Sequence, residues 1–209
     1  PRRAGFRRSP EQPSPEVGVP LLEPCHRGPS LLEASPGGRR PGLRLLQPPL
    51  RPPGVDPGLV RTGWAVVTTE GGRTALAAAG VIAPPPVGAL GARLREGFAA
   101  FTAVLEAQRP DLVVLEDIFT APAHPRSALL MAHLRGVLCL AVEQHGLPLL
   151  SLTASTVKQR LTGNGRASKA QVRGMVFQLC GLPPQRLRAD VTDAIALAIA
   201  GLSQERQLA

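Results

Sequence analysis

Regular patterns of apolar residues begin near residue 54 and alternate between two periods. Short, mostly apolar runs predict five strands, of which the first ends at Asp56 and the others lie at 63–69, 73–82, 112–116 and 147–152. Apolar residues at a helical period predict long helices at 89–108 and 127–144, and three more helices at 154–161, 168–179 and 190–202. This order predicts an α/β fold with a mixed five-stranded sheet and helices on both of its faces.

Residues 1–53 follow neither period. They hold more than half of the 23 prolines, together with Arg, Gly and Ser, and their few apolar residues are isolated. Such a segment cannot bury enough surface to offset the entropy cost of ordering it. We therefore expect a disordered extension at 1–53, a folded domain at 54–203 and a short tail at 204–209. The extension is best interpreted as an inert tail, with a DNA-binding arm or upstream sequence read in frame as alternatives.

Acidic residues stand where two predicted strands end. Asp56 precedes a Pro-Gly turn, and Glu116 follows a wholly apolar run. The ends of strands are where α/β folds place their ligands. Asp190 and Asp193 are three residues apart, so both lie on one face of the last helix and in its first turn. Together the four carboxylates predict a cage for hard divalent cations.

Each of these acids also has a simpler interpretation. Asp190 alone would be explained as a helix N-cap, and Glu116 as a surface acid at a strand end. Asp117 follows Glu116 directly, and we expect its side chain to point the other way, since side chains alternate along a strand. The prolines before Asp56 predict a short first strand, because proline lacks the donor that a central strand needs.

The chain is basic, with a net charge of +9 carried almost wholly by Arg. This balance favours a polyanionic partner, although GC-rich coding explains about half of it. Cys25, Cys139 and Cys180 lie far apart, which predicts neither a disulfide framework nor a zinc site and favours a reduced, intracellular protein. No apolar run reaches the roughly 18 residues that a membrane span needs.

Several stretches, taken in order from about residue 54 to 201, resemble the RuvC family of Holliday-junction resolvases. Each piece alone is common, but the ordered set is specific. The resemblance implies a ribonuclease H-like fold, which agrees with the order of strands and helices above. The stretches are Asp56-Pro57-Gly58, Thr62-Gly63, Val114–Phe119, Ser127-Ala128-Leu129, Arg135-Gly136-Val137, Val157-Lys158-Gln159, Gly163-Asn164-Gly165, Lys169–Val172 and Asp190–Ala198.

The resemblance implies a cytoplasmic crossover junction endodeoxyribonuclease that acts in homologous recombination and DNA repair. It implies that Asp56, Glu116, Asp190 and Asp193 are both the catalytic residues and the metal ligands. Two Mg²⁺ ions per subunit, with Mn²⁺ able to replace them, would hydrolyse the phosphodiester bond: one activates a water and the other stabilises the leaving 3′ oxygen. The implied result is a pair of symmetric nicks in a four-way junction.

DNA contacts are expected around the cage. Lys158 and Lys169 match family lysines that contact phosphate, although each alone would equally be a solvated helical lysine. Arg166 lies in a Gly-rich loop within reach of a phosphate. Phe119 matches the aromatic residue that the family wedges against bases near the crossover. A core position is the alternative for Phe119, but its polar, Pro-rich loop favours the wedge.

The partners implied are four-way junction DNA, a second copy of the chain, and the RuvA and RuvB branch-migration proteins. A homodimer is expected because a twofold enzyme matches a junction with two symmetric strands to cut. The second long helix is the predicted interface, and packing of its leucines in the core is the alternative. These leucines are Leu129, Leu130, Leu134, Leu138 and Leu140.

Two other classes of protein share parts of this pattern. Actin-like ATPases and sugar kinases also begin with Asp-x-Gly and a following Thr-Gly, but they need a second domain of the same kind, for which about 155 residues leave no room. A catalytically impaired module would keep the basic surface and bind junctions without cutting them. Binding of ATP would favour the first alternative, and tight binding without Mg²⁺-dependent cutting would favour the second.

Overall fold

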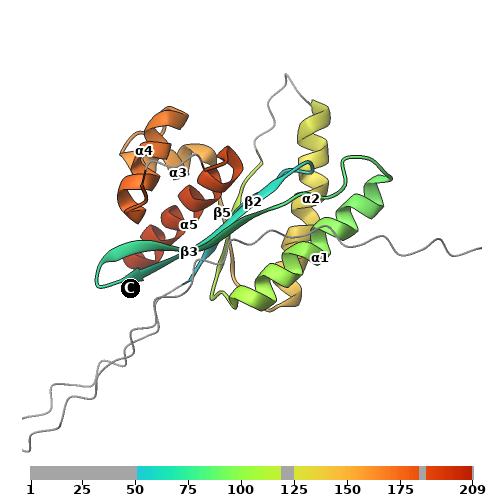
Figure 1. Cartoon of the computed structure of the whole chain (residues 1–209), viewed down its shortest axis with the longest axis horizontal. Coiled ribbons are helices and arrows are strands. Elements are labelled where there is room, and N and C mark those ends of the chain that lie inside the picture. Colours follow the sequence, from blue (N-terminus) through green and yellow to red (C-terminus); the bar gives the residue numbers. More distant parts are fainter. Residues whose placement is uncertain (1–50, 119–124, 184–186, 209) are drawn as a thin grey trace, which may run out of the picture.

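The computed structural model describes residues 51–118, 125–183 and 187–208. Every predicted strand and helix is present in this part of the chain, with ends that shift by a few residues (Figure 1). The elements are β1 (Pro53–Asp56), β2 (Thr62–Glu70), β3 (Arg73–Ile82), α1 (Leu90–Gln108), β4 (Val113–Glu116), α2 (Pro125–Gln144), β5 (Leu149–Leu152), α3 (Ala154–Thr162), α4 (Lys169–Cys180) and α5 (Ala189–Leu208).

The strands form one mixed sheet in the order β3-β2-β1-β4-β5, as expected. β2 runs antiparallel to both β1 and β3, whereas β4 runs parallel to both β1 and β5. β1 is short, as its prolines predict, yet it lies at the centre of the sheet. Val55 of β1 is paired with Trp64 of β2 on one side and with Leu115 of β4 on the other, so the strand that ends in Asp56 is held from both sides.

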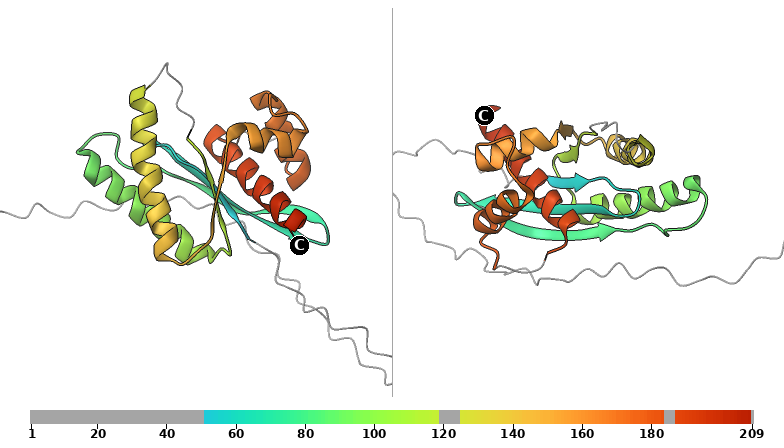
Figure 2. Two further views of the ribbon diagram at one scale, coloured as in Figure 1. Left: turned by 180° about the vertical axis from the view of Figure 1, so that it is seen from behind. Right: turned by 90° about the horizontal axis from the view of Figure 1, so that it is seen from above.

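Helices cover both faces of the sheet, which confirms the predicted layers. Figures 1 and 2 show α3, α4 and α5 on one face and α1 and α2 on the other. Side chains of β4 alternate between the two cores: Val114 packs with α5, while Val113 and Leu115 pack with α1 and α2. A strand buried on both faces needs the unbroken apolar run that the sequence has here.

Two glycines let α5 lie directly on the central strands. A Cβ atom at Gly54 would overlap the carbonyl oxygen of Ala194, and one at Gly63 would overlap the carbonyl oxygen of Asp190. Glycine within a strand is a known sign of such a close backbone approach. Because both glycines lack a side chain, the first turns of α5 reach the end of β1, where Asp56 lies.

The last helix is longer than predicted. It continues to Leu208 rather than ending at Leu202, so the helix extends into the residues expected to form the C-terminal tail. The segment after Leu202 contains Gln, Glu and Arg and no Gly or Pro, so no residue there favours an end to the helix. None of the helices in the described ranges is long and apolar enough to cross a membrane.

Candidate active site

Three of the four predicted carboxylates line one cavity of about 240 Å³. Asp56 comes from the end of β1, Glu116 from the end of β4 and Asp193 from the first turns of α5. β1 and β4 are parallel neighbours, so their carboxyl ends meet at one edge of the sheet. The remaining lining residues come from α3, α4 and α5 and are Ala154, Val157, Lys158, Lys169, Val172, Ala196 and Leu197.

Burial and acidic neighbours perturb the carboxyl group of Asp56 strongly. Burial, a side-chain hydrogen bond with Glu116, and the negative charges of Glu116, Asp193 and Asp190 together raise the pKa of Asp56 from 3.8 to about 8. Asp190 is not among the residues that line the cavity, but its charge reaches Asp56. The site therefore concentrates negative charge that a proton or a cation must compensate.

Basic side chains lie beside Asp190 and Asp193 of α5. Lys169 Nζ is 3.4 Å from Asp193 Oδ2, and Arg188 Nε is 3.8 Å from Asp190 Oδ2. Because α5 begins at Ala189, Asp190 lies inside the first turn and not at the N-cap position, which removes the simpler interpretation of this residue. Its place there is one where the helix dipole favours a negative charge.

Local capping fixes the position of Lys169. Ser168 caps α4 by accepting a hydrogen bond from the backbone N–H of Gln171, whose side chain accepts one from the N–H of Ser168 in return. Lys169 is therefore the first residue of α4, and its side chain faces α5. The loop that precedes Ser168 is held by Gln159, which accepts a hydrogen bond from the N–H of Gly165 and donates one to the carbonyl of Gly163.

The predicted DNA-contact residues do not all meet at the cavity. Lys158 and Lys169 line it, from α3 and α4 respectively. Arg166 is exposed in the loop between these helices and is not among the lining residues. Phe119 lies outside the described residues, so its expected contact with bases stays a prediction.

The leucines of α2 divide between two environments. Leu134 and Leu138 are buried in the core between α2 and the sheet, as the alternative interpretation has it. Leu129 and Leu140 are 59% and 50% exposed and are the large apolar side chains that α2 leaves on its surface within the described residues. Leu130 is partly buried against the same core. An interface on α2 would therefore use a narrower set of residues than predicted.

The carboxylates of the cavity suit divalent cations chemically, although their side chains are not arranged as a complete ligand set around one ion. Oxygen ligands from separate elements suit Mg²⁺, which takes one or two carboxylates and keeps several waters. Within the described residues, no three His, Cys, Asp or Glu side chains already stand as the ligands of one ion. The raised pKa of Asp56 supports a cation here, because a positive ion would offset the burial and the neighbouring negative charges that disfavour its ionised form.

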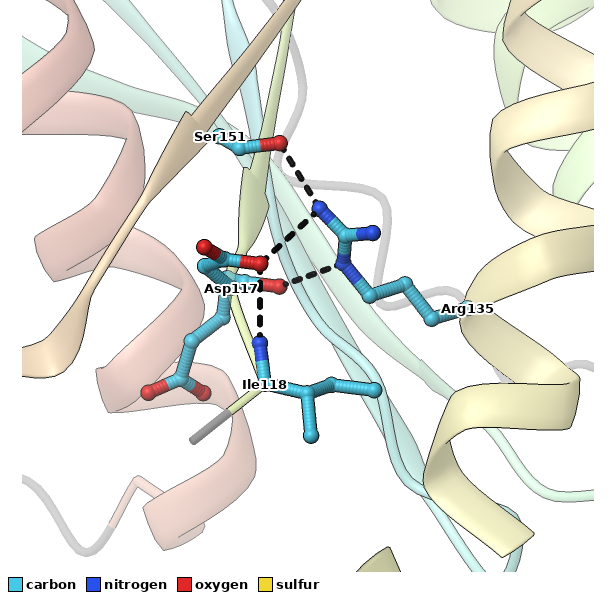
Figure 3. Close-up of polar contacts among 5 residues, drawn as sticks. Asp117, Ile118, Arg135 and Ser151 are labelled. Carbon is cyan, nitrogen blue, oxygen red and sulfur yellow. Dashed lines mark hydrogen bonds and ion pairs between the residues drawn. The ribbon is translucent and has the colours of Figure 1, made fainter. Parts of the chain in front are cut away.

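Sequence reasoning gave no physical role to Gly54, Gly63 or Arg135. The two glycines admit α5 to the sheet, and the signal for this is glycine inside a strand. Arg135 meets the end of β4 from α2, where it pairs with Asp117 on the side away from the cavity (Figure 3). The side chain of Asp117 thus points away from that of Glu116, as the alternation along β4 predicts.

The order of strands, the two helical layers and the carboxylates at the ends of β1 and β4 define a nuclease of the ribonuclease H-like class. The family model of the crossover junction endodeoxyribonuclease RuvC matches residues 53–201. The chain belongs to the RuvC family, which confirms the resemblance and makes it a DNA endonuclease of a metal-dependent family. Neither an actin-like ATPase nor an impaired binding module is favoured by these matches.

Individual relatives agree with this assignment. The RuvC protein of Rhodopirellula baltica is 41% identical over 148 residues, which are 71% of this chain and 83% of the relative. The RuvC protein of Neorickettsia sennetsu is 43% identical over 147 residues, or 69% and 88% of the two chains. Thermus thermophilus RuvC in complex with a Holliday junction substrate has a TM-score of 0.71 and 27% identity, covering 76% of this chain and 96% of that one. The yeast mitochondrial resolvase Ydc2, at 15% identity and a TM-score of 0.58, shares the fold.

Proposed function

We propose that the enzyme resolves Holliday junctions by Mg²⁺-dependent hydrolysis, as a homodimer that makes paired symmetric nicks in recombination and DNA repair. The observation that carries the proposal is the convergence of Asp56, Glu116 and Asp193 on one cavity that two lysines also line. The Thermus relative that was solved on a Holliday junction supports the choice of substrate. The bacterial relatives support action in the cytoplasm, with RuvA and RuvB as partners by family resemblance.

Asp56, Glu116 and Asp193 would hold the metal, with Asp190 beside them. Two bound Mg²⁺ ions would supply the activation of a water molecule and the neutralisation of charge on the cleaved phosphate. The chain itself supplies a rigid frame for the ligands, because Asp56 and Glu116 close adjacent strands and Asp193 lies on a helix packed against them.

Lys158 and Lys169 would bind the phosphates of the junction. The side chain of Lys169 is 83% exposed, so its pair with Asp193 is a weak surface ion pair that DNA can replace. With Asp193 serving as a metal ligand, the ammonium group of Lys169 would be available to a phosphate beside the cavity. Arg166 would contact the backbone farther from the cavity, and Phe119 would stack on a base near the crossover.

The homodimer would use the exposed part of α2. Leu129 and Leu140 are large apolar side chains on the surface of that helix, and burying them against a second copy would remove apolar area from water. A twofold dimer presents two identical carboxylate sites, which matches the two symmetric strands of a junction. This arrangement accounts for paired nicks.

The test is single-turnover cleavage of a synthetic four-way junction, measured beside a binding titration. Asp56→Asn, Glu116→Gln and Asp193→Asn each keep the shape of the site but remove a ligand charge. We expect each to reduce cutting by about 1,000-fold or more, because the metal supplies several kcal/mol and each 1.36 kcal/mol is tenfold. Binding should stay equal or become slightly tighter, since it rests on basic residues and falls steeply with salt.

Two further variants make the comparison specific. Asp190→Asn should be the mildest of the four carboxylate changes, because Asp190 does not line the cavity. Glu70→Gln is the matched control, since Glu70 is the exposed last residue of β2. Near-normal cutting by Asp56→Asn, with junction binding lost instead, would show that the carboxylates serve the structure and that the proposal is wrong.

A further inference from the structure

Arg135 binds the end of β4 from the face of the sheet opposite the cavity. It lies in the middle of α2, and its guanidinium contacts one group on β4, one on β5 and the side chain of Asp117, which follows β4 (Figure 3). Nε donates a hydrogen bond to the carbonyl oxygen of Glu116 at 3.1 Å, and Nη2 donates one to Oγ of Ser151 at 2.7 Å. Nη2 also lies 3.3 Å from Oδ1 of Asp117. The side chain of Arg135 is only 22% exposed, and its bond to the Glu116 carbonyl is partly buried.

These contacts hold the backbone of a residue that we assign to the metal site. The carbonyl that Arg135 binds belongs to Glu116, whose side chain leaves the other face of β4 and lines the cavity. β4 has only four residues, so the last peptide of the strand depends on the bonds that it makes. The N–H of Asp117 donates to the carbonyl of Leu152 at 2.8 Å, which ties the same peptide to β5. Arg135 thus completes the fixation of this peptide from the side of α2.

We propose that Arg135 is a positioning residue for Glu116, which fixes the backbone of this metal ligand from behind the sheet. The inference rests on the proposed role of Glu116 as a ligand. Groups that orient a metal ligand typically change metal affinity or activity by about 10–100-fold when they are removed. Arginine suits this role because its planar fork can bind a carbonyl and a hydroxyl at once, whereas lysine offers a single point charge.

The ion pair with Asp117 is a separate contribution that an experiment can isolate. The side chain of Asp117 is 48% exposed, and ion pairs of this kind contribute little. Its Oδ1 also accepts a hydrogen bond from the N–H of Ile118 at 3.1 Å, which Asn can still accept. Asp117→Asn therefore removes the charge pair and leaves the bond from Arg135 to the Glu116 carbonyl in place. We expect it to cut within about 2-fold of the wild type.

The experiment measures how cutting and metal binding depend on metal concentration. For Arg135→Gln we expect a single-turnover rate about 10-fold lower at saturating Mg²⁺ and a half-saturating Mg²⁺ concentration about 3–10-fold higher. The affinity of the DNA-free protein for Mn²⁺ should fall in parallel. This affinity is measured from the electron paramagnetic resonance signal of free Mn²⁺. Arg135→Lys should recover less than half of the loss, since it keeps the charge without the fork. Arg95→Gln, at an exposed arginine of α1, is the control and should match the wild type.

The outcomes separate this inference from the proposed function. If Glu116→Gln is inactive but Arg135→Gln and Arg135→Lys keep the normal metal dependence, the inference is wrong and the assignment of the site stands. If Glu116→Gln cuts normally, the proposed site itself is wrong. A lower melting temperature with unchanged affinity for Mn²⁺ would show that Arg135 only stabilises the fold. If Arg135→Gln does not fold, Arg135→Lys and Ser151→Ala replace it in the measurements of Mg²⁺-dependent cutting and Mn²⁺ binding. A loss of metal affinity in both variants would support the inference, and normal affinity in both would contradict it.

Discussion

Asp56→Asn should change how the stability of the metal-free enzyme depends on pH. The pKa of Asp56 is raised to about 8 in the folded state, against an ordinary value of 3.8 that applies to the unfolded chain. The folded state therefore binds this proton more tightly. Its contribution to stability is fully present below about pH 4 and is lost as the pH rises through about 8. Asparagine cannot ionise, so the variant lacks this loss.

The size of the effect follows from the linkage between proton binding and folding. Each pH unit between the two pKa values is worth about 1.36 kcal/mol, so the wild type should lose at most about 3 kcal/mol from this group between about pH 5.5 and about pH 8. The interaction of Asp56 with its acidic neighbours makes this figure an upper limit, and we expect an observed difference of about 1–3 kcal/mol. Asp56→Asn should therefore gain stability relative to the wild type by this amount over the same range.

The assay is urea unfolding in the presence of EDTA at several pH values. Trp64 is the single tryptophan and is buried, so its fluorescence reports unfolding of the sheet directly. Glu70→Gln serves as the control for the loss of a carboxylate elsewhere. Addition of Mg²⁺ near pH 8 should stabilise the wild type more than Asp56→Asn, since a cation relieves the same repulsion. Parallel stability curves for the wild type and Asp56→Asn would refute the view that burial and neighbouring carboxylates raise the pKa of Asp56.

Two other predictions concern the approach of α5 and the assembly of the enzyme. Gly63→Ala should lower cutting by about 10-fold or more and lower the melting temperature, because its Cβ would displace Asp190 and the start of α5. Gly91→Ala is the control, since a Cβ atom at Gly91 meets no other atom within 4 Å. Leu129→Glu combined with Leu140→Glu should give a monomeric mass by light scattering and unpaired nicks, whereas Val87→Glu, exposed outside α2, should not. A wild type that is monomeric both free and on a junction would contradict the proposed dimer.

The helices and strands could be predicted from the sequence because each has its own local pattern of apolar residues. The apolar run before Glu116 has the length of a strand buried on both faces, and the structure places it in that environment. The helical period in 89–108 similarly predicts α1, whose buried side chains include Phe101, Val104 and Leu105. The end of α5 could not be predicted, since no Gly or Pro follows Leu202 to end the helix. Local helix propensity alone does not set a boundary.

The candidate site could be predicted from the sequence only in part. Strand ends and the Asp190-Asp193 spacing predict the acids, and the structure brings three of them to one cavity with a fourth in electrostatic reach. The role of Arg135 could not be predicted, because its partners Glu116 and Ser151 lie 19 and 16 residues away in sequence and meet it only through the packing of α2 on the sheet. The same holds for Gly63, whose effect depends on which helix lies above it.

The two faces of the sheet make different contributions to the candidate site. On one face, Gly54 and Gly63 admit α5, so that Asp193 reaches the acids of β1 and β4. On the other face, Arg135 of α2 binds the peptide that carries Glu116. The exposed leucines proposed for the dimer lie on this same α2, so a shift of the helix on dimerisation would act on the backbone of a proposed metal ligand. Because Arg135 binds the peptide of a proposed metal ligand and not the DNA, its variants should affect the rate of cutting more than the strength of junction binding.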